Sequence, residues 1–127
     1  MSAPVIVVVD DEALLRWAVA ESLTAAGYSV YQAESAADAV RCLDQAKSFP
    51  LVVVLDLKLP DSNDLSLARK IMRDRPDAPV IMMTAHGSAQ DKAEAEAAGV
   101  YKFIQKPFDL SEMTAVVREA SAKLGDR

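Results

Sequence analysis

The sequence predicts an α/β fold built on a parallel sheet, and two observations support this prediction. Five segments of strand length alternate along the chain with five segments of helical periodicity. Three of the strand segments are almost wholly apolar, which is typical of strands covered by helices on both faces. Alternation at this spacing forms right-handed βαβ units, so we expect a doubly wound five-stranded parallel sheet with five helices.

The expected strands differ in polarity, and this difference predicts their order. The apolar segments are residues 5–9 (VIVVV), 51–55 (LVVVL) and 80–83 (VIMM), whereas residues 29–33 (SVYQA) and 101–105 (YKFIQ) are mixed. The first, third and fourth strands should therefore be central, and the second and fifth should be edges. Because consecutive strands usually lie side by side, we expect the order 2-1-3-4-5 of a flavodoxin-like sheet.

Each expected helix carries an apolar row and a recognisable cap or stop. The rows are, in chain order, Leu15, Val19 and Leu23; Ala36, Ala39, Val40 and Leu43; Leu67, Ile71 and Met72; Ala89, Ala93 and Ala97; and Leu110, Met113, Val117, Ala120 and Leu124. The boundary signals are Gly27, Ser35, the Arg75–Pro76 step, Gly99, and Asp109 with Glu112 before the fifth helix and Gly125 after it. The fourth helix, at residues 88–98, has only alanines in its row. Small side chains bury little area at about 25 cal/mol per Å², so this helix should be the most weakly anchored.

Composition restricts the class of protein. The chain has 127 residues, 51% hydrophobic and 26% charged, so residues 1–127 should form one folded domain. A formal net charge of −5 argues against direct nucleic-acid binding. The one cysteine, Cys42, allows no internal disulfide and favours a cytoplasmic location. No apolar stretch approaches the roughly 20 residues that span a membrane, and no secretory signal is visible.

Acidic residues follow two of the central strands. Asp10 and Asp11 follow the first strand, and Asp56 follows the third. In doubly wound sheets, ligands bind beyond the carboxyl ends of the strands where the strand order reverses, which here is between these two strands. The fourth strand ends in Thr84 and the fifth in Lys106. We therefore expect three carboxylates, a hydroxyl and an ammonium group along one crevice.

The charges of this cluster predict a metal ion. Three carboxylates and one ammonium leave an excess of negative charge, which a divalent cation would neutralise. Oxygen ligands without nearby His or Cys favour Mg²⁺. The alternative is that Asp10 or Asp11 caps the first helix, but one cap explains only one of the two acids. Glu12 is placed in the first helical turn, with no role in the site.

Four motifs at strand ends resemble those of a known family: "VVVDDE" at 7–12, "VVVLDLKLP" at 52–60, "MMTAH" at 82–86 and "FIQKPF" at 103–108. Together they resemble the receiver domain of bacterial two-component response regulators. The segments "MTAH", "KPFD" and "LLRW" are most similar to those of receivers of the nitrogen-regulation type, which precede sigma-54-dependent activation modules.

The resemblance implies a function for each residue of the cluster. Asp56 would accept a phosphoryl group from the phosphohistidine of a sensor histidine kinase and form an acyl phosphate. Asp10 and Asp11 would hold Mg²⁺ together with Asp56 and the backbone carbonyl of Lys58. Lys106 would contact the phosphoryl oxygens as a point charge, rather than being a solvated lysine at a strand end.

The resemblance also implies a switch. The hydroxyl of Thr84 would move to meet the phosphoryl group, coupled to the aromatic Phe103, whose plain reading is a packed edge-strand side chain. The bond before Pro107 would be cis. His86, at the mouth of the site, would tune hydrolysis of the acyl phosphate or would simply be an exposed loop histidine. The alanine-rich helix at 88–98 is expected to move on phosphorylation.

One position departs from the family pattern. The family usually has a glycine eight residues after the acceptor, where this chain has Asp64. That glycine commonly needs a left-handed backbone, which Asp tolerates better than most residues. We therefore expect the loop around Asp64 to be altered rather than broken.

Three other classes of protein fit less well. A phosphohydrolase of the haloacid dehalogenase type needs a second acid two residues after the nucleophile, where this chain has Lys58. A flavin carrier needs a phosphate-binding loop after the first strand, but "DDEALLR" has no glycine. A receiver-like interaction module that is never phosphorylated would be expected to lack one of the acids, Thr84 or Lys106.

Further expected partners are a C-terminal or separate output domain and a second copy of the chain, paired on phosphorylation.

Overall fold

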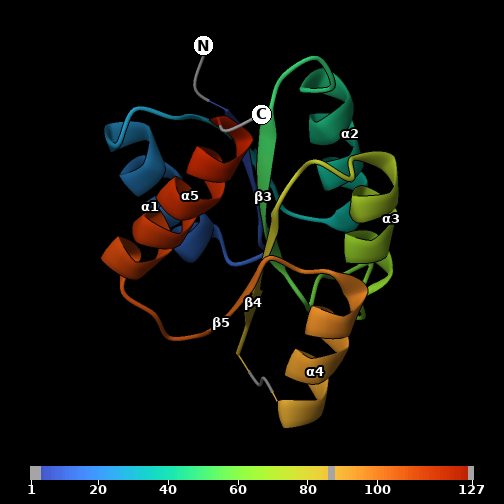
Figure 1. Ribbon diagram of the computed structural model, residues 1–127. Coiled ribbons are helices and arrows are strands. Elements are labelled where there is room, and N and C mark those ends of the chain that lie inside the picture. Colours follow the sequence, from blue (N-terminus) through green and yellow to red (C-terminus); the bar gives the residue numbers. More distant parts are fainter. Residues whose placement is uncertain (1–3, 86–87, 126–127) are drawn as a thin grey trace.

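The computed structural model describes residues 4–85 and 88–125, which form one sheet flanked by helices (Figure 1). The elements are, in chain order, β1 (Val5–Val9), α1 (Ala13–Ala25), β2 (Ser29–Ala33), α2 (Ala36–Gln45), β3 (Leu51–Asp56), α3 (Ser66–Asp74), β4 (Val80–Thr84), α4 (Ala89–Ala98), β5 (Lys102–Gln105) and α5 (Leu110–Gly125). Each of the expected strands and helices is present. The boundaries of β1 and β2 are the predicted ones, and β3, β4, β5 and α4 each differ from the predicted range by one residue at one end.

The sheet has the predicted topology. Its five strands run parallel in the order β2-β1-β3-β4-β5. Every residue of β1, β3 and β4 is buried, whereas β2 and β5 are partly exposed. The apolar strands are therefore central and the mixed strands are edges, as the polarity of the segments predicts. β1 and β3 are neighbours, and Val9 lies opposite Leu55, so both strands end at the same level of the sheet.

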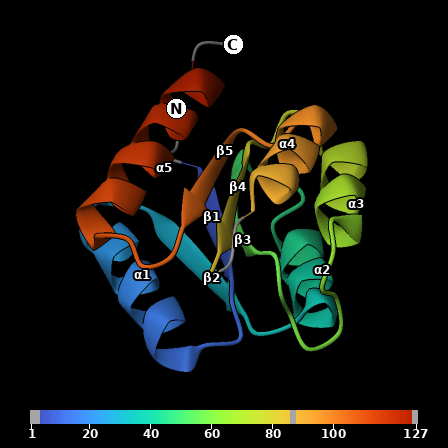
Figure 2. The same ribbon diagram turned by 90° about the horizontal axis from the view of Figure 1, so that it is seen from below.

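The helices form two layers, one on each face of the sheet. Helices α1 and α5 cover one face, and α2, α3 and α4 cover the other (Figures 1 and 2). Successive strand residues contribute to opposite layers: Ile6 and Val8 pack with α1 and α5, whereas Val7 and Val9 pack on the α2 and α3 side. This double cover explains why the central strands are apolar at every position.

Most of the predicted helix boundaries are found. The Ser35 hydroxyl accepts a hydrogen bond from the Asp38 backbone N–H at 3.1 Å, as predicted for a cap. Gly27 and Gly99 have φ of 102° and 105°, the left-handed conformation that ends α1 and α4. Gly125 is the last residue of α5 rather than the residue after it, a one-residue difference at a helix end. In the described part of the chain, no helix is both long and apolar enough to cross a membrane.

The alanine row of α4 corrects one prediction. Ala89, Ala93 and Ala97 are exposed, and the buried residue of the helix is Ala95. The sequence is ambiguous here because alanines occupy both sides of this helix, so apolar spacing does not choose a face. The energetic expectation is unaffected, since the buried side chain of α4 is still a single methyl group.

Candidate functional site

Three carboxylates that are distant in sequence meet at the carboxyl edge of the sheet. Asp10 follows β1, Asp56 is the last residue of β3, and these strands are neighbours. One oxygen from each of Asp10, Asp11 and Asp56 lies within 4.8 Å of the others. Asp10 is fully buried and Asp56 nearly so, whereas Asp11 is exposed. The fold therefore brings together the acids that the strand-end argument predicts to converge.

Lys106 completes this cluster from the end of β5. Its side chain is 10% exposed, and its Nζ lies 3.0 Å from Asp10 Oδ2 and 3.1 Å from Asp56 Oδ2. The ammonium group also lies 3.2 Å from Glu12 Oε1. The expectation that Glu12 has no place in the site is therefore wrong. Glu12 is the N-cap residue of α1, and the short loop after β1 turns its carboxylate toward Lys106.

Burial and charge shift the pKa values of this cluster. Burial raises the pKa of Asp56 above its ordinary value, and the negative charge of Asp10 raises it further. The Lys58 N–H, which donates to Asp56 Oδ1 at 3.2 Å, and the Lys106 ammonium group oppose this rise. For Lys106, burial alone would lower the pKa, but hydrogen bonds and charge from Asp10 and Asp56 raise it overall. Lys106 is therefore a permanent cation among several carboxylates.

Backbone and side-chain hydrogen bonds hold Asp10 in place. Its N–H donates to Ala33 O at 3.0 Å, and its Oδ1 accepts from the Glu12 N–H at 2.8 Å. The guanidinium of Arg16 donates to the backbone carbonyl of Asp10 at 2.7 Å and to Gln32 Oε1 at 3.2 Å. Sequence reasoning missed Arg16. The available signal was its position one helical turn after the acids, as the first basic residue of the chain.

The remaining predicted residues lie along the same edge. Thr84 ends β4 and is buried, and its carbonyl accepts from the Lys106 N–H at 2.7 Å. Lys58 has an exposed side chain. Phe103 is half-buried and packs against the core on the α2 and α3 face, as an edge-strand aromatic does. The Lys106–Pro107 peptide bond is cis.

His86 lies outside the described residues, so the structure tests neither of the two roles expected for this side chain.

Asp64 has a different conformation from the one expected. Among the described residues, only glycines have positive φ, so Asp64 is not left-handed. Its Oδ1 instead accepts hydrogen bonds from the Ser66 hydroxyl and from the Ser66 N–H, the latter at 2.9 Å. These bonds lower the pKa of Asp64, the hydroxyl bond most strongly. Asp64 thus anchors the start of α3, a task that needs a short polar side chain and no unusual backbone.

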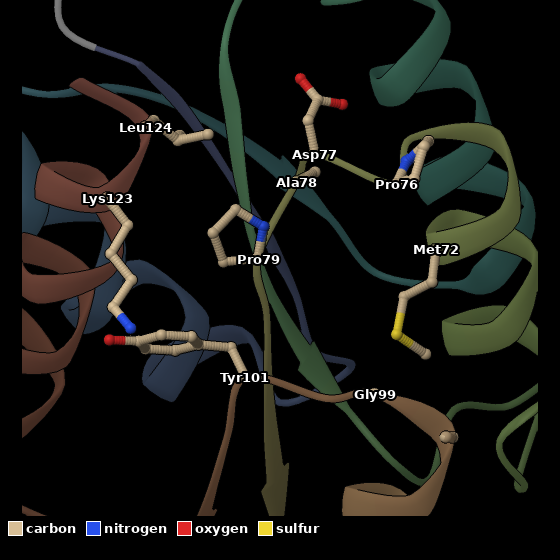
Figure 3. A pocket seen from close by; sticks show the side chains of 10 residues that line it. Met72, Pro76, Asp77, Ala78, Pro79, Gly99, Tyr101, Lys123 and Leu124 are labelled. Carbon is tan, nitrogen blue, oxygen red and sulfur yellow. The ribbon is translucent and has the colours of Figure 1, made fainter. Parts of the chain in front are cut away.

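Two cavities at opposite edges of the sheet differ in chemistry. A cavity of about 470 Å³ lies beside Lys106 and is lined by Glu12, Leu15, Ala85, Lys106, Pro107 and Phe108. Another, of about 350 Å³, lies at the amino edge between the start of β4, the α4–β5 turn and the end of α5 (Figure 3). Its lining includes Asp77, Tyr101 and Lys123, without a buried carboxylate. The ionisable groups that converge are those of the carboxyl edge.

Comparison with known families agrees with this geometry. Residues 6–118 match the family model of the response regulator receiver domain. The chain belongs to this family. A curated relative, the DNA-binding transcriptional regulator NtrC of Escherichia coli (strain K12), is 32% identical over 120 residues, which cover 94% of this chain and 25% of NtrC. The receiver domain thus spans about a quarter of the length of this relative.

Solved structures of receiver domains share the fold. A CheY-like receiver domain protein from Methanospirillum hungatei JF-1 has a TM-score of 0.90 and 25% identity, with 98% of each chain covered. The beryllofluoride-activated NtrC4 receiver domain, solved as a dimer, has a TM-score of 0.86 and 29% identity, covering 94% of this chain and 98% of that one. The similarity to NtrC confirms the resemblance to the nitrogen-regulation type.

Proposed function

We propose that this receiver domain accepts a phosphoryl group from a sensor histidine kinase onto Asp56 and changes conformation to control an output. The observation that carries the proposal is the convergence of Asp10, Asp11 and Asp56 on Lys106 at the carboxyl edge of the sheet. We propose that residues 1–127 act as a single domain for this purpose. The domain catalyses only its own phosphorylation and dephosphorylation.

The proposed transfer is an in-line displacement at phosphorus. A carboxylate oxygen of Asp56 forms a bond to phosphorus while the bond to the imidazole nitrogen of the phosphohistidine breaks. The electron pair of that bond returns to the imidazole, which takes a proton from water as it leaves. Lys106 contributes a fixed positive charge 3.1 Å from Asp56, where it can contact the transferred phosphoryl oxygens.

The cluster fits a hard divalent cation, because its donors are carboxylate oxygens held close together with too little positive charge among them. Asp10, Asp11, Asp56 and the backbone carbonyl of Lys58 would hold Mg²⁺. When bound, the ion supplies positive charge that offsets the phosphoryl oxygens. Lys106 is protonated in the cluster, since Asp10 and Asp56 raise its pKa.

We propose that Thr84 and Phe103 carry the response. A phosphoryl group adds roughly 1.5 to 2 negative charges beside the end of β4. Thr84 is the buried hydroxyl residue at that strand end, and Phe103 lies on β5 opposite Met82, two residues before Thr84 in β4. Helix α4, which follows Thr84 in the chain and buries only Ala95, is the element that we propose to shift.

Partners and location are also proposals. The kinase would approach the carboxyl edge, where Leu14 of α1 is 83% exposed and Trp17 is 57% exposed, an apolar surface that a partner could cover. The NtrC relative is a DNA-binding transcriptional regulator, which supports control of an output domain, and the net charge of −5 favours no direct nucleic-acid binding by this domain. The NtrC4 dimer supports pairing on phosphorylation. A cytoplasmic location, with no membrane contact, fits a domain that is phosphorylated by a kinase module.

The test is intact mass after incubation with acetyl phosphate, with and without Mg²⁺. We expect a single phosphoryl adduct in the wild type that requires both Mg²⁺ and Asp56, and none in Asp56→Asn. Asp44→Asn, which alters an exposed acid of α2, is the matched control and should accept the group normally. A folded wild-type protein that forms no adduct at saturating Mg²⁺ would instead be a receiver-like interaction module.

A further inference from the structure

The loop between β3 and α3 is attached to α2 through one carboxylate. Asp61 accepts a hydrogen bond on Oδ1 from the Ala36 N–H at 2.7 Å and on Oδ2 from the Ala37 N–H at 3.1 Å. These two N–H groups belong to the first turn of α2, more than twenty residues away in sequence. A side chain from another segment thus satisfies amides that a helix cannot satisfy itself.

The two backbone N–H groups that donate to Asp61 are those that the capping residue of α2, Ser35, leaves without a hydrogen bond. Ser35 accepts from the Asp38 N–H, and its backbone carbonyl accepts from the Ala39 N–H. The Asp61 carboxylate accepts hydrogen bonds from the two remaining N–H groups of the turn. An anion at a helix N-terminus is favourable, and the Ala36 and Ala37 amides hold the pKa of Asp61 below its ordinary value. The contact is therefore charged and bidentate at neutral pH.

Backbone hydrogen bonds link the turn that carries Asp61 to the acidic cluster. Leu59 and Ser62 exchange backbone hydrogen bonds, of 2.8 Å and 3.3 Å, which close the turn that carries Asp61, and the Leu59 side chain is buried. On the other side, the Lys58 N–H donates to Asp56 Oδ1. The segment from Asp56 to Ser62 is therefore hydrogen-bonded at both ends, to Asp56 at one and to α2 at the other.

From this arrangement we infer that Asp61 is a positioning residue, which holds the β3–α3 loop against α2 so that the Lys58 carbonyl is kept in place to bind Mg²⁺. The inference rests on the proposed function, because it needs the metal site at Asp10, Asp11 and Asp56. Asp61 itself does not touch the metal ion. It acts through the turn at Leu59 and Ser62, as residues that support metal ligands commonly do.

The experiment measures Mg²⁺ affinity by calorimetric titration with MgCl₂ at fixed ionic strength. Asp61→Ala removes both hydrogen bonds and should weaken Mg²⁺ binding by about tenfold, the lower end of the effect of losing a supporting contact at a metal site. Asp61→Asn retains one acceptor oxygen, and its affinity should lie between those of wild type and Asp61→Ala. Asp64→Asn is the matched control, because it removes the same charge from the same loop and keeps an acceptor for Ser66. Its affinity should remain close to that of the wild type.

Amide hydrogen exchange without Mg²⁺ supplies the second measurement. In Asp61→Ala, the Ala36, Ala37 and Leu59 amides should exchange faster, while those of β1 and β3 should be unchanged.

Faster exchange with an unchanged Mg²⁺ dissociation constant would overturn the inference and leave Asp61 as a structural cap of α2. An equal loss of affinity in Asp64→Asn would also overturn it, because the effect would then be one of charge. If the wild type bound no Mg²⁺, both this inference and the proposed metal site would fail. Wild-type binding without an effect of Asp61→Ala would remove the inference alone.

Discussion

Two lysines at opposite edges of the sheet have very different surroundings. Lys106, at the carboxyl edge, is 10% exposed and lies within 3.2 Å of carboxylate oxygens from Asp10, Glu12 and Asp56. Lys123, at the amino edge, is exposed and lies over the ring of Tyr101, 5.2 Å from its centroid. The Tyr101 hydroxyl donates to Glu119 Oε1 at 2.6 Å. Acids, a lysine and a cavity are thus present at both edges, and Figure 3 shows the cavity at the amino edge.

The difference lies in burial and in the number of carboxylates that converge on the lysine. At the carboxyl edge, adjacent parallel strands deliver Asp10 and Asp56 to the same level of the sheet, where both are desolvated. At the amino edge, Tyr101 comes from a loop and is half-buried, and Glu119 lies on an exposed helix surface, where solvent screens its charge. Residue types alone do not define a reactive site. Strand register and burial do.

Removing each lysine should give the largest contrast between the edges. Lys106→Met leaves Asp10 and Asp56 buried without their cation, and should lower the free energy of unfolding by about 3 kcal/mol without Mg²⁺. Lys123→Met loses an exposed contact and should change it by less than about 0.5 kcal/mol. Urea denaturation of both variants at pH 7 measures the difference. Equal losses would mean that the buried ion pairs add nothing beyond a surface contact.

The ionised acidic cluster should lower the free energy of unfolding, and this loss should depend on pH. The pKa of Asp56 is raised in the folded state, so its ionisation opposes folding above that pKa, and the penalty disappears as the pH falls through it. Asp56→Asn should therefore be more stable than wild type at pH 7 without Mg²⁺. The gain should shrink as the pH approaches the ordinary Asp value, about 4.

Urea denaturation of wild type and Asp56→Asn between pH 4 and pH 8 tests this, with Asp44→Asn as the exposed control. A wild type that is the more stable of the two at pH 7 would contradict the prediction.

Much of this comparison follows from sequence. The polarity of the strands predicts their order, and the order places Asp10, Asp11 and Asp56 together. Both features can be predicted because they depend only on the regular geometry of a parallel sheet. Glu12 and Arg16 were not predicted as neighbours of the site, since the direction of their side chains depends on a short loop and on the placement of α1 against β2.

The β3–α3 loop shows the same limit. The glycine that the family usually has at the position of Asp64 suggested a left-handed residue, whereas in the structure the Asp64 carboxylate anchors α3. The partner of Asp61 lies on α2, more than twenty residues away, and no local pattern connects them. Alanines occur on both sides of α4, so the choice of Ala95 as its buried residue depends on packing. Contacts that depend on tertiary placement are those that single-sequence patterns do not determine.

A substitution at the amino edge should have the smallest effect, which should be confined to the titration of Tyr101. Burial, followed by the hydrogen bond and charge of Glu119, raises the pKa of Tyr101 to about 12. Glu119→Gln removes the charge but leaves the burial, so the pKa of Tyr101 should fall only part of the way toward its ordinary value of about 10. Tyrosinate absorbance measures the shift, with Tyr101→Phe identifying which transition belongs to this residue. Mg²⁺ affinity and phosphoryl uptake should be unchanged in Glu119→Gln, because the Tyr101–Glu119 pair lies at the edge opposite the acidic cluster. A change in either property would show that the two edges are energetically coupled through the sheet, and the contrast between them would then be incomplete.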